Sequence, residues 1–538
     1  MPYEPVIGME VHAELKTKSK MFCDSQNGFG LEKEPNVNIC PVCTGQPGTL
    51  PVINQEAVKM VIKSGLALNC KIAEDSFFER KNYFYPDLPK GYQISQYQKP
   101  LCFEGHLEIN GNKIGITRIH LEEDTGKLIH PKGADYSLVD FNRAGVPLME
   151  LVTEPDIRSG ADAKNFCQEL QLILRYLGVS DADMEKGQMR CEVNISLRET
   201  AEPRSEPEQA RDGAGGTDTQ NHAENNLLPE RSGAESKAHS VNSSTSSGDN
   251  RLGTKVEIKN LNSFKVVEKA IDYEIKRQAE ILESNGKVIQ ETRGWDDNKE
   301  ETFSQRVKEE AHDYRYFTEP DLPPLKNLTA ISAKLKNELP ELPQQKRVRL
   351  ANEYGLPAAD IEVLAMNKES ADYFEEACSE LDETEHEEKK FGDEELKRMY
   401  KLAVNYLITE IPRIADRLQV ISYKLQDKIA AENFAEFVVL TYQGKISSSG
   451  AQKVLEEMFK TGVDPSHIIE THDLAQVSDI SVLENVADEV INENPQPAMD
   501  YKAGKEASLQ FLVGQIMKKT KGKANPKVVG ELLREKLK

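Results

Sequence analysis

The fold of the first part of this chain is decided by one stretch, Gln188-Met189-Arg190-Cys191-Glu192-Val193-Asn194-Ile195-Ser196-Leu197-Arg198. Apolar and polar residues alternate along it, and a period of two residues is the mark of a β-strand with one buried face. Residues 255–259, Lys-Val-Glu-Ile-Lys, alternate in the same way. The simplest interpretation is a hairpin whose two strands are joined by a very long connection.

That connection, residues 200–250, has the composition of a disordered segment. Its only large apolar residues are Leu227, Leu228 and Val241, and it contains no aromatic residue. Such a segment cannot bury enough apolar surface to offset the conformational entropy that folding removes. Because the cost of closing a loop grows only slowly with its length, the strands on either side can still pair. We therefore expect a disordered insertion at 200–250.

Outward from these strands, the chain divides into a sheet-rich part and a helical part. Residues 6–15 and 115–121 have strand patterns, whereas residues 161–177 have helical spacing. Beyond Leu325 almost every segment has a helical period. These patterns predict an α+β fold. The expected parts are a sheet-rich N-terminal domain at 1–325, a helical domain at 326–425 and a helical tail domain at 426–538.

The chain is strongly acidic, but its charge is unevenly distributed. The 538 residues include 90 Asp and Glu against 68 Lys and Arg, a net charge of −22. A field of this sign repels phosphate, so the chain is not a general binder of polyanions. Residues 375–396 hold eleven acids and two lysines, whereas the last 21 residues hold eight Lys and Arg and two Glu. The tail is either a solubilising helix end or a surface for an RNA backbone.

Two sequence features predict the cellular compartment of the chain. No apolar run approaches the roughly 18–20 residues that a membrane span needs, and the first residues lack the pattern of a secretory signal. The eight cysteines show no disulfide framework, as is usual in a reducing compartment. We therefore expect a cytoplasmic protein without membrane contact.

Two clusters of acids and histidine are candidates for a metal site. In the run Glu10-Val11-His12-Ala13-Glu14, strand geometry places Glu10, His12 and Glu14 on one face. Carboxylates with an imidazole suit a divalent cation, and the oxygen ligands favour Mg²⁺ over zinc. The second cluster is Glu122-Glu123-Asp124, just before a glycine turn. The alternatives are a solvated strand face for the first cluster and a simple acidic turn for the second.

Three cysteines offer a different kind of site. Cys40 and Cys43 form a Cys-x-x-Cys pair, and Cys23 lies upstream. A structural zinc site needs four ligands, but Asp24 and Ser25 stand where a second upstream cysteine could be. Structural zinc and unligated thiols are both compatible with this pattern.

Seven longer motifs together carry a resemblance to a known family. The longest, residues 139–156, reads VDFNRAGVPLMELVTEPD. The others are residues 7–12 (IGMEVH), 81–87 (KNYFYPD), 120–127 (HLEEDTGK), 259–264 (KNLNSF), 313–317 (DYRYF) and 511–517 (FLVGQIM). In this order the chain resembles the B subunits of the glutamine-dependent aspartyl/glutamyl-tRNA amidotransferases, from end to end apart from 200–250 and the acidic stretch near 382–393. The resemblance implies a cradle domain, a helical domain and a helical tail that binds tRNA.

The resemblance also implies a function, that of one component of a ligase that forms a carbon–nitrogen bond with glutamine as the amide donor. The implied substrate is a misacylated tRNA, Glu-tRNA(Gln) or Asp-tRNA(Asn), whose side-chain carboxylate is phosphorylated by ATP. Ammonia released by the glutaminase (A) subunit then displaces the phosphate, and the C subunit completes a heterotrimer. No nucleophile for glutamine hydrolysis is expected in this chain.

The same resemblance assigns residues to these steps. It implies that Glu10, His12 and Glu123 are catalytic. The implied Mg²⁺ ligands are Glu10, His12, Glu122, Glu123 and Glu192. The candidates for holding ATP, phosphate or carboxylate are Lys81, Asn82, Tyr83, Arg143, Lys259, Arg306 and Lys308. Zinc at Cys23, Cys40 and Cys43 occurs in some members of the family and stays open for this chain.

Two other functions compete with this one. A tRNA-docking scaffold without catalysis would keep the basic tail but would have no need of Glu10, His12 and Glu123. A metal-dependent hydrolase could use the same acids and histidine with an activated water. The sequence contains no His-Glu-x-x-His motif, which disfavours the hydrolase.

Overall fold

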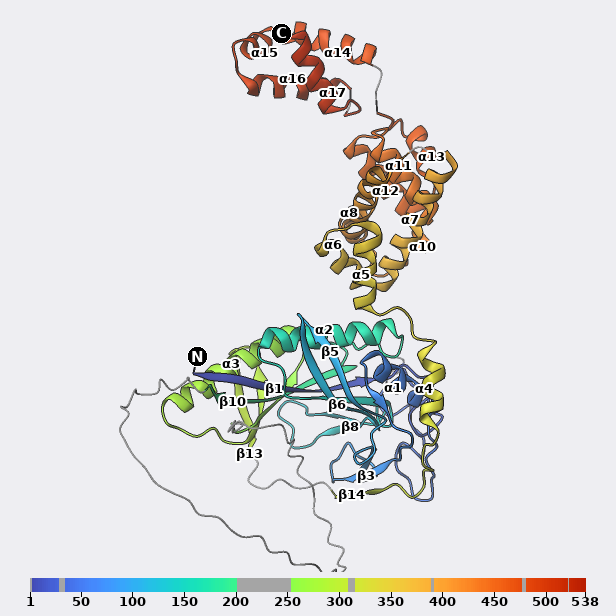
Figure 1. Ribbon diagram of the computed structural model, residues 1–538, viewed down its shortest axis with the longest axis vertical. Helices are drawn as coiled ribbons and strands as arrows, with labels where there is room; N and C mark the ends of the chain where they lie inside the picture. Colours follow the sequence, from blue (N-terminus) through green and yellow to red (C-terminus); the bar gives the residue numbers. More distant parts are fainter. Residues whose placement is uncertain are drawn as a thin grey trace, which may run out of the picture. The chain divides into compact units, whose positions relative to one another are not determined.

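A computed structural model describes residues 2–28, 34–200, 253–307, 315–388, 391–476, 480–520 and 522–538. These residues form two compact units, Met1–Leu339 and Pro340–Lys538 (Figure 1). The first unit mixes strands with helices and the second is helical, which confirms the predicted α+β class. The insertion expected at 200–250 lies outside the described residues, apart from Thr200.

The first unit is organised around a nine-stranded sheet. Its strands are β1 (Tyr3–Glu14), β2 (Lys71–Ile72), β5 (Cys102–Ile109), β6 (Asn112–Glu123), β9 (Pro147–Thr153), β10 (Met189–Glu199), β11 (Val256–Leu261), β12 (Glu291–Asp296) and β13 (Glu301–Val307). Their order is β13-β12-β11-β10-β1-β9-β6-β5-β2. Strands β10 and β11 pair antiparallel, which confirms the two strands predicted on either side of the insertion.

Smaller elements complete this unit. A three-stranded sheet has the order β14-β3-β4, formed by β3 (Glu79–Asn82), β4 (Tyr92–Ser95) and β14 (Arg315–Thr318). A two-stranded sheet joins β7 (Lys127–Ile129) to β8 (Leu138–Asp140). The helices are α1 (Gln55–Ala67), α2 (Gly160–Tyr176), α3 (Phe264–Glu283) and α4 (Leu328–Lys336).

Helices α2 and α3 lie side by side over one face of the large sheet (Figure 1). A serine side chain caps each at its N-terminus, since Ser159 accepts from the Asp162 N–H and Ser263 from the Val266 N–H. The thiol of Cys167 on α2 contacts Cys191 on β10. Because successive residues of a strand point to opposite faces, the odd-numbered residues of β10 face the helices and the even-numbered residues face away.

The apolar face of the sheet therefore forms the core of the first unit. Met9 and Val11 on β1 pair with Val193 and Cys191 on β10, and all four side chains are buried. Each fully buried aliphatic or aromatic side chain stabilises the fold by about 1.5–3 kcal/mol. The opposite face carries the polar residues of the same strands, as the alternation in β1 predicted.

The second unit consists of helices throughout its described residues. They are α5 (Pro343–Tyr354), α6 (Ala358–Ala365), α7 (Lys368–Glu388), α8 (Asp393–Asn405), η1 (Tyr406–Glu410), α9 (Ile411–Arg417), α10 (Leu425–Lys428), α11 (Ala431–Tyr442), α12 (Ser448–Thr461), α13 (Pro465–Thr471), α14 (Ile480–Glu493), α15 (Pro495–Lys502), α16 (Glu506–Lys519) and α17 (Pro526–Lys536). No helix among the described residues of either unit is long and apolar enough to cross a membrane.

This helical unit contains two separate hydrophobic cores. One extends from Leu350 to Ile469 and includes Tyr373 and Phe434, and the other extends from Leu483 to Leu537. The predicted domain boundary between residues 425 and 426 falls inside the first core. Helices on both sides of that point supply its buried side chains, so they pack as one body.

Candidate active site

The polar face of the large sheet carries a row of four titratable residues, one from each of four neighbouring strands. The register pairs Arg190 on β10 with His12 on β1, His12 with Glu150 on β9, and Glu150 with His120 on β6. Directly opposite residues in antiparallel strands have Cβ atoms about 4.5–5.5 Å apart, so their side chains meet. The sheet thereby assembles residues that lie far apart in the sequence.

Glu150 lies at the centre of this row. Its carboxylate is 3.4 Å from Nε2 of His12 and 3.2 Å from Nε2 of His120. Glu122 lies 3.6 and 3.8 Å from the same two nitrogens. The side chains of His120, Glu122 and Glu150 are at most 7% exposed. Charges buried at this density need partners of opposite charge or a metal ion.

The protonation states of His12, Glu150 and His120 follow from burial and from the opposite charges of neighbouring side chains. Burial lowers the pKa of His12, but the hydrogen bond to Glu150 and the charges of Glu150 and Glu122 outweigh it and raise that pKa to about 9. The pKa of His120 is also raised, because the same two carboxylates outweigh its burial. Burial raises the pKa of Glu150, but the two imidazolium rings hold it well below its usual value.

Side chains of this face form two possible ligand sets for a metal ion, and both sets include Glu150. One is Glu10, His12 and Glu150, and the other is His120, Glu122 and Glu150, with the ligand atoms of each set within 4.8 Å of one another. Burial and the neighbouring Glu150 and Glu192 carboxylates raise the pKa of Glu10. A divalent cation would relieve this repulsion, so the oxygen and nitrogen donors fit such an ion.

The structure places four of the five predicted Mg²⁺ ligands on this face. Glu10, His12 and Glu122 belong to the two ligand sets. Glu192 lies opposite Glu10 in the register, and its carboxylate is 2.8 Å from Nζ of Lys259, another predicted residue. These positions place the predicted Glu192 and Lys259 at the edge of the cluster.

Glu123 is not brought together with the other predicted ligands. It follows Glu122 on β6 and therefore points to the opposite side of the strand. Nζ of Lys90 lies 2.6 Å from its carboxylate, and the Ile94 N–H donates to it at 3.0 Å. Glu123 and Lys90 line a separate pocket with a cavity volume of about 200 Å³.

Sequence reasoning missed Glu150 and His120 as site residues. His120 could have been found, because it precedes Glu122 by two residues and shares its strand face. Glu150 gives no such signal, since it is the one acid in the apolar strand PLMELVT. Its role depends on β9 lying between β1 and β6, which is a property of the assembled sheet.

One cation and two aromatic rings, from the three-stranded sheet and the segment just after β4, lie beside the row. Burial lowers the pKa of Lys81, but the charges of Glu122 and nearby groups, among them Glu150, outweigh it and raise that pKa above its usual value. The ring of Tyr97 stacks on Tyr316, with centroids 4.7 Å apart, and Tyr97 is half-exposed. A half-exposed aromatic ring beside cations and carboxylates is suited to contact a planar ligand.

The remaining predicted cofactor residues have varied positions. Asn82 donates to the Arg315 carbonyl at 2.7 Å and so holds β3 to β14. The ring of Tyr83 lies 6.0 Å from Nζ of Lys81. Nε of Arg143 lies 3.3 Å from the Asp124 carboxylate and donates to the Thr125 carbonyl.

The last two predicted cofactor residues lie at the end of β13. The backbone of Arg306 pairs with Thr292 on β12. The side chain of Arg306 and the whole of Lys308 lie outside the described residues.

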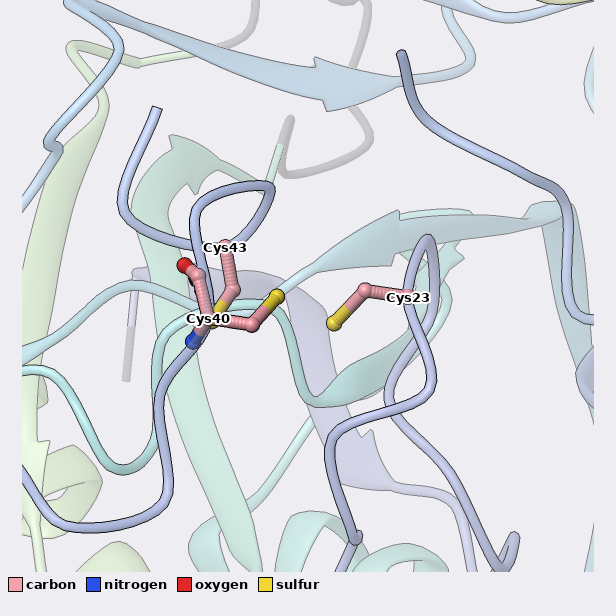
Figure 2. Close-up of side chains that lie close together, drawn as sticks. All are labelled: Cys23, Cys40 and Cys43. Atoms are coloured by element: carbon pink, nitrogen blue, oxygen red, sulfur yellow. Dashed lines mark hydrogen bonds between the residues drawn. The ribbon is translucent and has the colours of Figure 1, made fainter. Parts of the chain in front are cut away.

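The three predicted thiols come together, carried by separate loop segments (Figure 2). Their sulfur atoms lie within 4.8 Å of one another. The Cys23 thiol donates a hydrogen bond to Cys43, which lowers the pKa of Cys43 to about 5 against the opposing effect of burial. The backbone N–H of Cys40 and the ammonium of Lys20 add to this lowering. The same hydrogen bond and burial raise the pKa of Cys23.

These thiols do not complete a closed zinc site within the part of the chain that the structure describes. The group contains three sulfur ligands and no further His, Cys, Asp or Glu. Nζ of Lys20 lies 3.8 Å from Sγ of Cys43, and a protonated amine cannot bind a metal ion. Structural zinc sites are closed by four ligands, so one is missing here.

Comparison with known families defines the class of protein that carries this site. Residues 5–211 and 238–332 match the GatB/GatE catalytic domain, and residues 392–537 match the GatB domain. The first match contains Arg190, His12, Glu150 and His120, so the polar face of the sheet belongs to a catalytic domain.

Curated relatives match the chain over its whole length. The aspartyl/glutamyl-tRNA(Asn/Gln) amidotransferase B subunit from Persephonella marina is 45% identical over 100% of both chains. Its counterpart from Caldicellulosiruptor saccharolyticus is 46% identical over 100% of this chain and 99% of the relative. The chain therefore belongs to the family of aspartyl/glutamyl-tRNA(Asn/Gln) amidotransferase B subunits. This confirms the predicted family and the predicted enzyme class.

Proposed function

We propose that this chain phosphorylates and then amidates the side-chain carboxylate of misacylated tRNA, Glu-tRNA(Gln), Asp-tRNA(Asn) or both. The observation that carries this proposal is the row of Arg190, His12, Glu150 and His120 on the face of the sheet opposite α2 and α3. Its dense charges of both signs are suited to binding ions and phosphate rather than to stabilising a core.

The chemistry requires activation before amidation. A carboxylate is a poor acyl donor because oxide is a poor leaving group. The substrate carboxylate oxygen therefore attacks the γ-phosphorus of ATP, and ADP leaves. Ammonia then attacks the carbonyl carbon, phosphate leaves, and loss of a proton gives the amide. Both steps develop negative charge on phosphate oxygens, so the site must position the reactants and neutralise that charge.

The cluster around Glu150 is the proposed site for Mg²⁺, held by Glu10, His12, His120, Glu122 and Glu150. When bound, the ion supplies positive charge beside the phosphate oxygens. Before an ion binds, Glu150 accepts hydrogen bonds from both imidazoles and so fixes the orientation of the two rings.

Two residues outside this five-residue cluster, Glu192 and Glu123, were also expected in the site from the sequence. Their roles stay predictions. Glu192 is the remaining predicted Mg²⁺ ligand of the polar face, opposite Glu10. Glu123 is predicted as catalytic from its family position, and its pairing with Lys90 places it at the neighbouring pocket.

Lys81 and the ring pair of Tyr97 and Tyr316 are the proposed contacts for ATP. The ammonium supplies a point charge for phosphate, and the half-exposed ring supplies a stacking surface for a base. Arg118 lies 3.9 Å from Glu150 and 5.4 Å from the Tyr97 ring, where a guanidinium can reach either. The predicted roles of Asn82, Tyr83, Arg143, Lys259, Arg306 and Lys308 in holding ATP or phosphate stay predictions.

The proposed partners are the glutaminase (A) subunit and the C subunit, in a heterotrimer that acts on tRNA in the cytoplasm. The helical tail is the proposed tRNA contact. Lys518, Lys527 and Arg534 are exposed on α16 and α17, where cations can approach an RNA backbone. A structural zinc ion at Cys23, Cys40 and Cys43 also stays a prediction, which elemental analysis of the purified protein tests.

The test is Glu150→Gln in the complex reconstituted with both partner proteins and both misacylated tRNAs. We expect ATP-dependent amidation to fall by about 10²–10³-fold, because a central negative charge is lost without a change of shape. Glutamine hydrolysis by the glutaminase should continue. The matched control is Glu108→Gln, which removes an exposed carboxylate from β5 of the same sheet.

Three outcomes would contradict the proposal. Unchanged amidation by the Glu150→Gln complex would remove the row from the reaction. A reaction that needs no ATP and releases the amino acid from tRNA would favour a hydrolase. Normal tRNA binding without any reaction in the wild-type complex would favour a docking scaffold.

A further inference from the structure

Strand β4 of the three-stranded sheet lies against the end of β6, the strand that carries His120 and Glu122. In the large sheet, the pairing of β5 with β6 ends at Ile119. Beyond that point, β4 and the residue that follows it contact β6, and the Leu121 N–H donates to Oε1 of Gln96 at 3.0 Å. A strand of one sheet therefore borders the proposed metal site of another.

The backbone of β4 is fixed to β6 on both sides of Ser95. Before it, the Ile94 N–H donates to Oε1 of Glu123 at 3.0 Å, and Nε2 of Gln93 donates to the Glu123 carbonyl at 2.8 Å. After it comes Gln96, whose amide oxygen accepts from β6. The side chains of Gln93 and Gln96 are buried, so water does not compete for these bonds. Ser95 is thus held in a defined position beside β6.

The hydroxyl of Ser95 reaches the carboxylate of Glu122. Its Oγ donates to Oε2 of Glu122 at 3.1 Å, and both residues are at most 3% exposed. The other carboxylate oxygen of Glu122, Oε1, lies 3.6 Å from Nε2 of His12. The serine therefore holds one oxygen of the carboxylate while the other faces a second proposed ligand of the ion.

We propose that Ser95 is a positioning residue of the metal site, whose hydroxyl orients the Glu122 carboxylate for the divalent cation. The inference rests on the proposed function, because Glu122 is a proposed Mg²⁺ ligand. Carboxylate ligands are commonly held by hydrogen bonds from residues behind them, and these bonds tune the affinity for the ion. A carboxylate that is already oriented loses less freedom when the ion binds, so binding is tighter.

A positioning role differs from a purely structural role in what it changes. A hydroxyl that only satisfies a buried carboxylate contributes to the stability of the metal-free protein. A hydroxyl that orients a ligand also changes the affinity for the ion. The experiment must therefore measure metal binding and stability separately.

The test is the affinity of the full-length chain for Mn²⁺, measured by isothermal titration calorimetry. Ser95→Ala should raise the Kd by about 10–100-fold, the range found when residues behind metal ligands are removed. Ser95→Thr keeps a hydroxyl at the same position and should retain the wild-type Kd. The matched control is Ser196→Ala, which removes a buried hydroxyl from β10 at a position opposite Val6. It should also retain the wild-type Kd.

Thermal unfolding with and without Mn²⁺ gives a second readout. An ion that binds the folded chain raises the unfolding midpoint by an amount that depends on its concentration relative to the Kd. The rise should be smaller in Ser95→Ala than in the wild type at the same Mn²⁺ concentration, and complete in Ser95→Thr. Because each variant is compared with its own metal-free form, this difference does not depend on the stability that the substitution itself changes.

Three results would overturn the role of Ser95. They are an unchanged Kd in Ser95→Ala, an equal loss of affinity in Ser196→Ala, and a Kd in Ser95→Thr as weak as that of Ser95→Ala. Failure of the proposed function has a different signature. A wild-type chain that binds no Mn²⁺ would remove the metal site itself, and unchanged amidation by the Glu150→Gln complex would remove the row from the reaction.

Discussion

The sheet-based unit and the helical unit bury charge in different ways. On the sheet, buried side chains include Glu14, His120, Glu122, Asp124 and Glu150. In the described part of the helical unit, Lys346 is the only charged side chain that is buried. Burying charge costs free energy unless the charge is paired, so a fold accepts it where function requires it. The difference separates a unit with many buried charges from one built by apolar packing.

The largest expected effect on stability lies in the helical unit. Phe434 is fully buried there, with its ring centroid 5.8 Å from that of Tyr373. Phe434→Ala should lower the free energy of unfolding by about 3–5 kcal/mol, because a cavity replaces the ring. Urea unfolding followed by circular dichroism measures this change. The control, Phe511→Ala, removes a ring that is 47% exposed and should cost about 0.5 kcal/mol.

Equal stability of these two variants would contradict the conclusion that apolar packing stabilises the helical unit. The comparison would also fail if Phe434→Ala removed metal binding by the sheet, because the two units would then not depend on separate interiors.

A second prediction concerns the pH dependence of metal binding at the row. The pKa of His12 is raised to about 9, so its imidazole is protonated at neutral pH and must lose that proton to bind a metal. Affinity for Mn²⁺ or Mg²⁺ should therefore rise at least about tenfold for each pH unit up to pH 9, because His12 and also His120, whose pKa is raised, must each lose a proton. Isothermal titration calorimetry in buffers of different ionisation heat measures both affinity and proton release.

The same shift affects the stability of the metal-free protein. His12 is raised from its unfolded value of 6.5, so its contribution is fully present below pH 6.5 and is lost as the pH rises through about 9. His12→Asn should reduce both pH dependences. His106→Asn, a control on β5, should leave them unchanged. A wild-type affinity that is flat from pH 7 to pH 9 would mean that His12 is not a ligand.

The third prediction tests whether exposed cations of the helical unit contact tRNA. Replacement of Lys518, Lys527 and Arg534 by Gln should weaken tRNA binding and reduce the slope of log Kd against log salt by about 2–3. Filter binding or fluorescence anisotropy over a range of salt measures the slope. The control replaces three exposed lysines of the first unit, Lys287, Lys334 and Lys336. Equal slopes in the two variants would remove the tail from the tRNA contact.

Substitution is preferable to deletion of residues 518–538. Helix α17 supplies Val529 and Leu533 to the second helical core, and both are buried. Deleting the tail would therefore unfold that core and would not isolate the effect of charge.

The smallest expected effect is at an exposed ion pair. Nζ of Lys536 lies 2.7 Å from Asp488, whose side chain is 57% exposed. Lys536→Gln should change the free energy of unfolding by about 0–1 kcal/mol, because water and salt screen such pairs. Thermal unfolding at low and high salt measures it. A loss as large as that of Phe434→Ala would show that the helical unit depends on charge after all.

Much of the candidate site could be predicted from local pattern, and the rest depended on strand order. Glu10 and His12 share a strand face because of the two-residue period, and Glu122 lies two residues from His120 for the same reason. Alternation along β6 also separates Glu122 from Glu123, although the sequence suggested one acidic cluster. Glu150 could not be identified in this way, because its neighbours His12 and His120 come from strands distant in the sequence.

The fold, like the site, could be predicted from the sequence only in part. The periods of apolar residues predicted the strands beside the insertion and the α+β class. They did not predict which helices share a core, because a period of 3.6 residues defines a buried face but not the helix that covers it. Tyr373 and Phe434 share one core across the predicted boundary for this reason.

If the row binds the proposed ion, its position across four strands also makes metal occupancy a reporter of correct assembly. A slip of one residue in any of the pairings between β10, β1, β9 and β6 would turn that strand's site residues toward α2 and α3. A chain with native secondary structure but a wrong register would therefore bind no ion. Quality control during expression could use this property, since the bound fraction of Mn²⁺ would count correctly registered sheets rather than helices or strands.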